Sequence, residues 1–183
     1  NRAYFNQQLR LKINRASLNN TTLALLFLDL DRFKVINDSL GHDAGDLVLK
    51  AAAERIRNAV RATDLVSRLG GDEFTVVLED LDSKDNAADI SKKIIDAISQ
   101  PFVFLKQRLF ISASVGISLY PDDGRTSGEL IKHADNAMFK AKVSEESFCY
   151  YDASMENEAI KRLRNESELR AAFELDQFFV VYK

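Results

Sequence analysis

The stretch LVSRLGGDEFTVVL, residues 65–78, contains two short apolar segments joined through Gly70 and Gly71. Glycine accepts the positive φ angles of tight hairpin turns, so a Gly-Gly pair between apolar segments predicts two antiparallel strands, over residues 65–69 and 74–78. A hairpin in a chain that also carries helical patterns favours an α+β fold. We expect a mostly antiparallel central sheet flanked by helices.

The segments around this hairpin show strand and helix patterns. Residues 22–30 (TLALLFLDL) form a near-continuous apolar run, which is typical of a strand buried on both faces. Phe5, Leu9 and Ile13 recur at four-residue spacing and predict a helix over residues 1–18. Similar patterns predict helices over residues 33–40, 43–60, 85–99 and 126–143, and strands over 102–105, 108–119 and 148–151. Asp43 is expected to cap the helix that begins there.

The composition excludes several classes of protein. The 183 residues are 46% hydrophobic and 29% charged, which is ordinary for a globular chain and excludes disordered, collagen-like and disulfide-dense proteins. A formal net charge of −3 is not that of a general nucleic-acid binder, so nucleic acid is not expected as a partner. The single cysteine, Cys149, has no internal partner for a disulfide. We expect a cytoplasmic domain, cut from a longer protein whose membrane attachment the sequence leaves open.

Acidic residues stand at the ends of the expected strands. Asp29 and Asp31 end the buried strand, and Asp72 and Glu73 follow the Gly-Gly pair. Carboxylates beside a hydrophobic sheet are costly to bury unless a cation pairs with them. If the two segments are neighbouring strands, Asp29 and Asp72 meet at one end of the sheet, and oxygen ligands of this kind suit Mg²⁺ and phosphoryl transfer. The alternative is that these acids only cap strands and solvate turns.

Cationic and amide side chains follow the same strand. Lys34 lies in the expected short helix, where a lysine and free backbone amides can bind phosphate. Lys34, and likewise Lys142 at the end of a later helix, can instead belong to solvated helix ends. Asn37 and Asp46 have the donors and acceptors to read a guanine edge. Helix capping is the alternative for the loop that contains them, although it explains these two residues less well.

Together these segments resemble the GGDEF family, the diguanylate cyclases. The family signature is present as Gly70-Gly71-Asp72-Glu73-Phe74 and lies between expected strands, as the family requires. Asn1-Arg2 resembles the end of the family's N-terminal motif. Further family-like blocks occur in the family order, at residues 28–38, 41–46, 113–118 and 134–142. The resemblance covers residues 1–151, which we expect to form one domain.

The resemblance implies a fold related to nucleotide-cyclase and polymerase-palm domains, with a ferredoxin-like core. It implies that two GTP condense to cyclic di-GMP and two pyrophosphates, in a homodimer whose two domains face each other across a two-fold axis. It also implies Mg²⁺ or Mn²⁺ as the cofactor, held by Asp29, Asp72 and Glu73 with the carbonyl of Leu30.

Roles for the remaining residues are implied by position. Asp72, Glu73 and Lys34 are the implied catalytic residues: Glu73 would ligate metal or help deprotonate the ribose 3′-hydroxyl, and Lys34 would stabilise phosphate charge. The residues implied to contact GTP, through side chains or through the protein backbone, are Phe33, Asn37, His42, Asp46, Gly70, Gly71 and Lys142. The glycines would let the backbone approach the nucleotide.

Arg61-Ala62-Thr63-Asp64 resembles the family's product-inhibition motif, RxxD. The arginine fork matches guanine O6 and N7, and an aspartate accepts from guanine N–H groups. The resemblance therefore implies that Arg61 and Asp64 form an inhibitory site for cyclic di-GMP. The alternative is an i,i+3 ion pair at a helix end.

The chain departs from the family pattern after Lys142. There the family continues with two variable residues and Gly-Arg-Asn, whereas this chain reads Val143-Ser144-Glu145-Glu146-Ser147. The family arginine that touches the GTP phosphates falls on Glu146, which should weaken nucleotide binding. Residues 152–183 resemble the linker helix and first strand of a truncated EAL phosphodiesterase domain. The alternative function is therefore a catalytically weak or silent GTP-binding domain that regulates an attached EAL domain.

Overall fold

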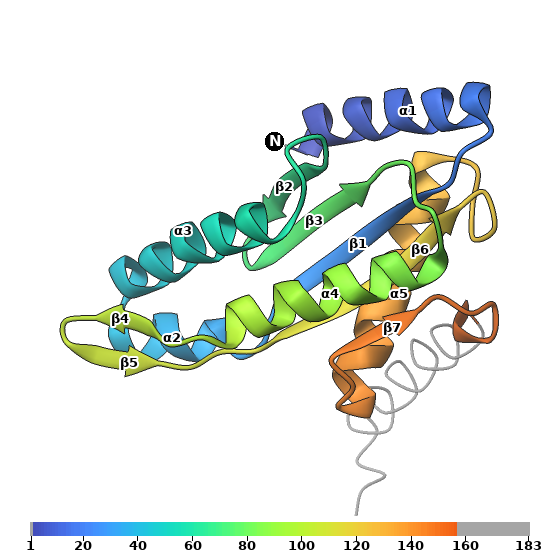
Figure 1. Cartoon of the computed structure of the whole chain (residues 1–183). Helices are drawn as coiled ribbons and strands as arrows, with labels where there is room; N and C mark the ends of the chain where they lie inside the picture. The colour runs from blue at the N-terminus through green and yellow to red at the C-terminus, as the bar shows by residue number, and fades with distance from the viewer. Residues whose placement is uncertain (1, 157–183) are drawn as a thin grey trace, which may run out of the picture. The chain divides into compact units, whose positions relative to one another are not determined.

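A five-stranded sheet forms the centre of the fold in the computed structural model, which describes residues 2–156 (Figure 1). Adjacent strands of the sheet are antiparallel, except that β6 and β7 are parallel. The α+β class and the mostly antiparallel sheet predicted from sequence are confirmed. In spatial order the strands are β2 (Leu65–Gly70), β3 (Glu73–Leu78), β1 (Leu23–Leu30), β6 (Ala113–Tyr120) and β7 (Phe148–Tyr150).

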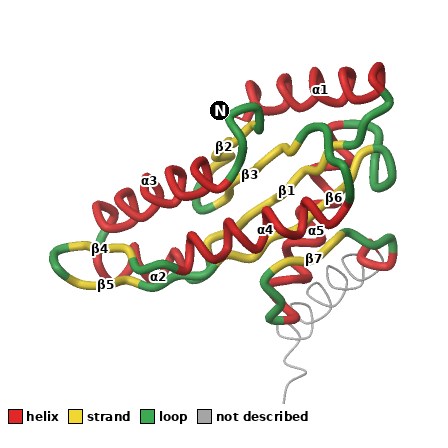
Figure 2. Tube along the Cα trace, in the orientation of Figure 1, coloured by secondary structure: helices red, strands yellow, loops and turns green. Residues whose placement is uncertain are grey.

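Two layers of helices cover the two faces of this sheet, and Figure 2 shows β3, β1 and β6 running side by side among them. One core lies between the sheet and α2 (Phe33–Leu40), α3 (His42–Ala59) and α4 (Lys84–Ser99). The other core lies between the sheet and α1 (Arg2–Asn19) and α5 (Ser127–Ser144). Phe5, Leu9 and Ile13 of α1 are buried in this second core, as their spacing predicts.

Strand β1 is buried on both sides, which confirms the reading of its apolar run. Its even-numbered residues Leu26 and Leu28 belong to the core under α3 and α4, and its odd-numbered residues Leu25 and Phe27 belong to the core under α1 and α5. This division follows from the alternation of side chains along a strand. Asp29 continues the odd-numbered series, so its carboxylate lies on the side of α5.

Helix α5 lies directly on β6 because Gly116 has no side chain. A Cβ at residue 116 would lie 2.0 Å from the carbonyl oxygen of Ala134 and 2.1 Å from the amide nitrogen of Met138. A capping box of Thr126 and Glu129 begins the helix. This close packing brings the far end of α5, which carries Lys142, to the end of β1.

Two local predictions are wrong. The single strand expected over residues 108–119 is broken: β5 (Gln107–Leu109) pairs with β4 (Phe102–Phe104) in a separate sheet, and β6 begins only at Ala113. Residues 110–112 between them belong to neither strand, although the amide of Asp31 still bonds to the carbonyl of Ser112 at 2.9 Å, beyond the last β1–β6 pair. The cap is also misplaced, since α3 begins at His42 after Gly41 and Asp43 lies in its first turn.

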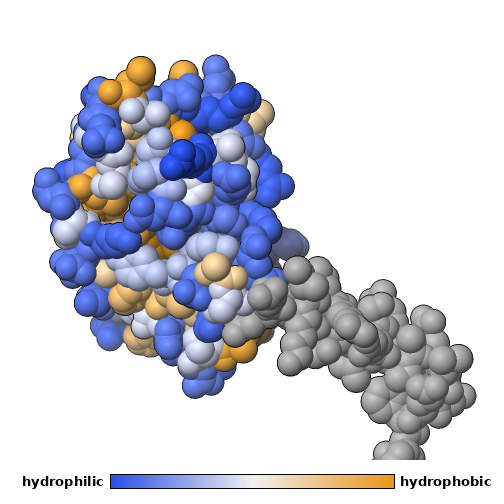
Figure 3. Space-filling model, turned by 90° about the vertical axis from the view of Figure 1, so that its right-hand side faces the viewer, coloured by the Kyte–Doolittle hydropathy of each residue, from blue (hydrophilic) through white to orange (hydrophobic). Residues whose placement is uncertain are grey.

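The contacts of the chain divide into two units, residues 1–151 and 152–183. The predicted linker helix and EAL strand fall almost wholly on residues 157–183, which lie outside the described residues, so that assignment stays a prediction. Within residues 2–156, no helix is both long and apolar enough to span a bilayer. The face shown in Figure 3 is mainly hydrophilic, and its apolar areas are small and scattered.

Candidate functional site

Three of the predicted acidic residues meet at one end of the sheet. Asp29 on β1 stands opposite Glu73 on β3 in the strand register, and both side chains lie on the face covered by α5. Asp72 lies in the turn just before Glu73, and its carbonyl accepts a hydrogen bond from the amide of Leu30 at 3.3 Å. The structure therefore brings together the stretches that the sequence analysis expected to converge.

The carboxylates at this end of the sheet repel one another. Burial raises the pKa of Asp29, and the nearby charges of Asp72 and Asp31 raise it further, while Lys142 opposes them. Burial also raises the pKa of Glu73, with a second contribution from Asp135 on α5. Raised pKa values show that negative charge is held here at a cost, because each acid would bind a proton more readily than it does in water.

Asp135 is a member of this cluster that the sequence analysis did not single out. Desolvation raises its pKa, and the charge of Asp29 adds to the effect. Arg2 of α1 acts in the opposite direction on both Asp135 and Glu73. The spacing held a usable signal, because Asp135 and Lys142 are related as i and i+7 and so lie on one face of α5.

Lys142 supplies the positive charge nearest to Asp29. Its Nζ lies 2.5 Å from Asp29 Oδ1, and the two side chains are 41% and 15% exposed. The ion pair joins residues that are 113 positions apart in the chain. The family resemblance implies that both residues lie at the nucleotide, but no pattern in the sequence indicates that they contact each other.

The residues at this corner fit a divalent cation in their donor chemistry. Hard carboxylate oxygens of Asp29, Asp72 and Glu73 adjoin the backbone of Leu30, and burial, with a smaller contribution from neighbouring carboxylates, raises the pKa values of Asp29 and Glu73. Among residues 2–156, however, no three His, Cys, Asp or Glu side chains are already arranged as a ligand set. The donors would have to gather around an ion.

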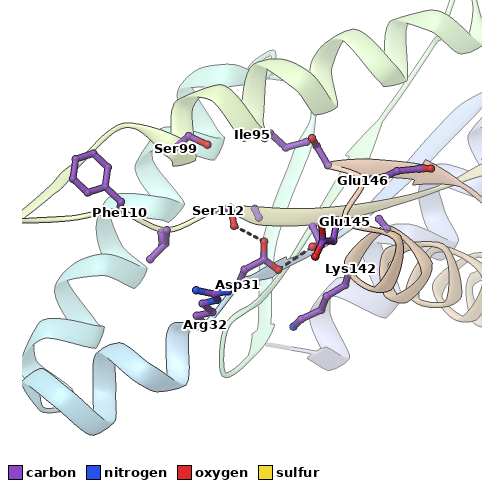
Figure 4. Close-up of a pocket in the computed structure, with 14 residues that line it drawn as sticks. Asp31, Arg32, Ile95, Ser99, Phe110, Ser112, Lys142, Glu145 and Glu146 are labelled. Atoms are coloured by element: carbon purple, nitrogen blue, oxygen red, sulfur yellow. Dashed lines mark hydrogen bonds between the residues drawn. The ribbon is translucent and has the colours of Figure 1, made fainter.

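Asp31 has a different role from Asp29. Its carboxylate accepts hydrogen bonds from Ser112 Oγ at 2.7 Å and from Ser114 Oγ at 2.8 Å (Figure 4). With the bond from the Asp31 amide to the Ser112 carbonyl, these contacts tie the start of β6 to the end of β1. Asp31 is therefore occupied by protein donors.

A pocket of about 750 Å³ opens beside Lys142, between α4, the start of β6 and the chain that follows α5. In Figure 4, Arg32 and Lys142 extend on the same side of Asp31, whereas the carboxylate of Glu146 points away from both. The lining residues are Asp31, Arg32, Ile95, Ser99, Phe110, Ile111, Ser112, Ala113, Ser114, Ala141, Lys142, Glu145, Glu146 and Ser147.

The chain after α5 is held close to that helix. Glu145 takes a left-handed conformation, with φ of 58°, and its N–H bonds to the carbonyl of Ala141. The N–H of Glu146 bonds to the same carbonyl at 3.0 Å. The backbone of Glu146 therefore lies at the pocket where the sequence analysis expected a phosphate contact, although its carboxylate does not point inward.

The predicted guanine-binding residues gather where α2 meets α3. The side chain of Asn37 lies over Gly45, since a Cβ at residue 45 would be 1.9 Å from Asn37 Oδ1. Asp46, the next residue, lines two hollows of about 430 Å³ each along α3. His42 is exposed at the first residue of α3. Asn37 and Asp46 are thus brought together.

The other predicted substrate contacts differ in their exposure. Lys34 is exposed on the first turn of α2, whereas Phe33 is only 6% exposed and packs in the core. Phe33 can therefore offer its backbone but not its ring. No atom lies within 4 Å of the position that a Cβ would take at Gly70 or at Gly71, and Gly71 has φ of 50°. Open space above the hairpin is what a close approach of a nucleotide requires.

The two residues of the predicted inhibitory site differ in exposure, since Asp64 is buried and Arg61 is exposed. Asp64 is 4% exposed, and its carboxylate accepts a hydrogen bond from the backbone N–H of Arg61 at 2.8 Å. Arg57 donates to the carbonyl of Asp64 at 2.7 Å. Arg61 itself is exposed. Asp64 thus closes the turn through the backbone of Arg61 and leaves the guanidinium of Arg61 at the surface.

The sequence of this chain is similar to that of a known protein family and its members. The family described as "Diguanylate cyclase, GGDEF domain" matches residues 1–147. The bifunctional diguanylate cyclase/cyclic di-GMP phosphodiesterase MucR of Pseudomonas aeruginosa is 42% identical over 100% of this chain, which spans 27% of the length of MucR.

Two solved structures show the same fold. The GGDEF domain of TpbB (YfiN) from Pseudomonas aeruginosa superposes with a TM-score of 0.83 and 40% identity, over 85% of this chain and 92% of that one. An EAL/GGDEF domain protein from M. capsulatus has a TM-score of 0.70 and 46% identity, over 82% of this chain and 97% of that one. The five-stranded sheet and its helices are thus those of known GGDEF domains.

Proposed function

Because this chain belongs to the diguanylate cyclase family with a GGDEF domain, we propose that it condenses two GTP into cyclic di-GMP with release of two pyrophosphates. The observation that carries the proposal is the convergence of Asp29, Asp72 and Glu73 at one end of the sheet, with Lys142 against Asp29. Hard oxygen donors beside a lysine suit the binding of a metal and a phosphate.

Asp29, Asp72 and Glu73, with the carbonyl of Leu30, are the residues that would hold Mg²⁺ or Mn²⁺. When bound, such an ion polarises the phosphate and offsets its developing charge. Lys142 would exchange Asp29 for the terminal phosphates of GTP, since its ammonium already lies at this corner. As an alternative to ligating the metal, Glu73 would accept the proton of the ribose 3′-hydroxyl.

Other residues would bind the rest of the nucleotide. Asn37, His42 and Asp46 would bind the guanine base where α2 meets α3. The open space at Gly70 and Gly71 would let the nucleotide approach the backbone of the hairpin. Lys34 and the amides near Phe33 would stabilise phosphate charge at the start of α2. These contacts would act mainly by positioning the reactants and neutralising charge.

One copy of this site would hold one GTP. The attacking 3′-hydroxyl and the α-phosphate that it attacks belong to different GTP molecules, so two copies of the chain must face each other across a two-fold axis. We propose that the working form is such a homodimer. Cyclic di-GMP would inhibit it at the turn that contains Arg61 and Asp64, with Arg61 making the guanine contact.

A second function is favoured by the charges in the pocket beside Lys142. Glu145 and Glu146 line the pocket where terminal phosphates would lie and supply no positive charge there, although the carboxylate of Glu146 points away from Lys142. The alternative is therefore a GTP-binding domain with weak or no turnover, which regulates an attached EAL phosphodiesterase domain. The relative MucR, named a bifunctional diguanylate cyclase/cyclic di-GMP phosphodiesterase, supports the attached phosphodiesterase in this alternative.

The two functions are separated by incubating the chain with GTP and Mg²⁺ and then separating the nucleotides. Appearance of cyclic di-GMP supports the cyclase, whereas GTP that binds and is recovered unchanged supports the regulatory domain. Asp72→Ala should abolish turnover, while Asp89→Ala, an exposed acid of α4, should leave it unchanged. Turnover that survives in Asp72→Ala would remove Asp72 from the metal site.

A further inference from the structure

The pocket beside Lys142 contains an arginine, Arg32, whose guanidinium has no partner among the described residues 2–156. Arg32 follows the end of β1 in a left-handed conformation, with φ of 59° and ψ of 19°, and its side chain lines the pocket. Within residues 2–156, its guanidinium makes no hydrogen bond or ion pair. An arginine has five N–H donors, so this one is available to a ligand.

The acid beside Arg32 in the chain does not neutralise it. Asp31 is occupied by the hydroxyls of Ser112 and Ser114, at 2.7 and 2.8 Å. These two bonds hold the carboxylate toward the start of β6. The adjoining positive charge of Arg32 is thereby left for another anion.

Two positively charged side chains line the pocket. Arg32 and Lys142 are its basic residues, and Figure 4 shows both extending on one side of Asp31. Lys142 contacts Asp29, so this side of the pocket adjoins the acidic corner of the sheet. Glu145 and Glu146 come from the chain after α5 and supply no positive charge. An anion that lies beside Asp29 and draws Lys142 toward it would therefore extend toward Arg32.

We propose that Arg32 binds the terminal phosphates of GTP together with Lys142. This inference rests on the proposed function, because it takes GTP as the ligand of the site. The planar guanidinium can donate two parallel N–H bonds to phosphate oxygens. Arg32 thus supplies from the end of β1 the positive charge that Glu145 and Glu146 do not supply from the end of α5.

The proposal is tested by titrating the chain with a non-hydrolysable GTP analogue and, separately, with GMP. Arg32→Ala should weaken binding of the analogue about 10-fold or more, which is the effect expected for charge-assisted hydrogen bonds. GMP lacks the terminal phosphates, so its binding should not change. Arg32→Lys keeps the charge without the planar fork. Its affinity for the analogue should therefore lie between those of Arg32→Ala and the unmodified chain. Arg15→Ala, an exposed arginine of α1, is the matched control and should bind both ligands as the unmodified chain does.

Each other result has a distinct meaning. Unchanged binding of the GTP analogue by Arg32→Ala would overturn the role of Arg32 and leave the proposed function standing. An equal loss for GMP and for the analogue would also overturn it, since the arginine would then act on the base, the sugar or the fold. Failure of the unmodified chain to bind either nucleotide would instead overturn the proposed function itself.

Discussion

Single residues at the end of β1 acquire their roles from which side of the sheet they face. Asp29 follows Leu25 and Phe27 onto the side of α5 and there meets Glu73 and Lys142. Because the site is partly buried, each charge acts more strongly than it would in water. We therefore expect substitutions that change a charge near this corner to change the binding of GTP, and those in the turn of Arg61 to change inhibition by cyclic di-GMP.

Glu146→Arg should tighten the binding of GTP. The backbone of Glu146 lies at the pocket beside Lys142, and the change would replace a negative charge with one that attracts phosphate. Titration with a non-hydrolysable GTP analogue would show an affinity several-fold higher, as expected for one partly exposed charge contact. Asp82→Arg, which makes the same change in an exposed loop, serves as the control. If affinity stays the same or falls, the chain after α5 does not reach the phosphates.

Arg61→Ala should relieve inhibition by cyclic di-GMP. The change removes the exposed guanidinium but keeps the backbone N–H that Asp64 binds, so the turn itself should persist. Initial rates measured with GTP and increasing cyclic di-GMP would show that about 10-fold more product, or more, is needed for half inhibition. Arg108→Ala on β5 is the control. Inhibition that persists undiminished would show that Arg61 does not bind the product.

At the scale of elements, the packing of α5 on β6 positions the cationic side of the site. The helix lies on Gly116, and Ser118 Oγ donates a hydrogen bond to the carbonyl of Leu130 at 2.8 Å. The capping box at Thr126 fixes where α5 begins. These contacts determine where Lys142, in the last turn, meets Asp29.

Gly116→Ala should destabilise the fold by about 1–3 kcal/mol or more, because the new methyl group would meet backbone atoms of α5 that cannot move aside alone. Gly128→Ala is the matched control: nothing lies within 4 Å of that position, and a helical alanine should be neutral or stabilising by about 0.4–1 kcal/mol. Urea unfolding of both variants measures the difference. Equal stability of Gly116→Ala and the unmodified chain would contradict the close packing.

For the whole molecule, the proposed reaction requires more than one copy. Asp29, Asp72 and Glu73 form one acidic corner in the unit of residues 1–151, which suits one GTP. The small, scattered apolar areas of the face in Figure 3 do not form a large hydrophobic interface on that side. Because two copies must meet, we expect the rate to depend on protein concentration.

The rate of cyclic di-GMP formation per molecule should rise with protein concentration. A sharper form of this test adds Asp72→Ala in excess to the unmodified chain. Most active copies would then face an inactive one, so formation of the cyclic product should fall several-fold by mass action. Serum albumin at the same concentration serves as the control. A constant rate per molecule and no suppression by Asp72→Ala would show that one copy acts alone.

The sequence by itself determined the class of fold and the residue types of the site. The apolar run of β1, the hairpin at residues 65–78 and the spacing in α1 are local patterns, and local periodicity reports which faces are buried. The motifs also named Asp29, Asp72, Glu73 and Lys142 before their geometry was known. The break between β5 and β6 could not be predicted from local alternation, because it depends on the two segments pairing with different strands, β5 with β4 and β6 with β1.

Only the tertiary structure decided which charges contact each other. The Asp29–Lys142 pair and the addition of Asp135 to the acidic cluster both depend on α5 lying on β6 at Gly116. The physical reason is that alternation within a strand selects a face, whereas the neighbour across that face is selected by long-range packing, which no local pattern records.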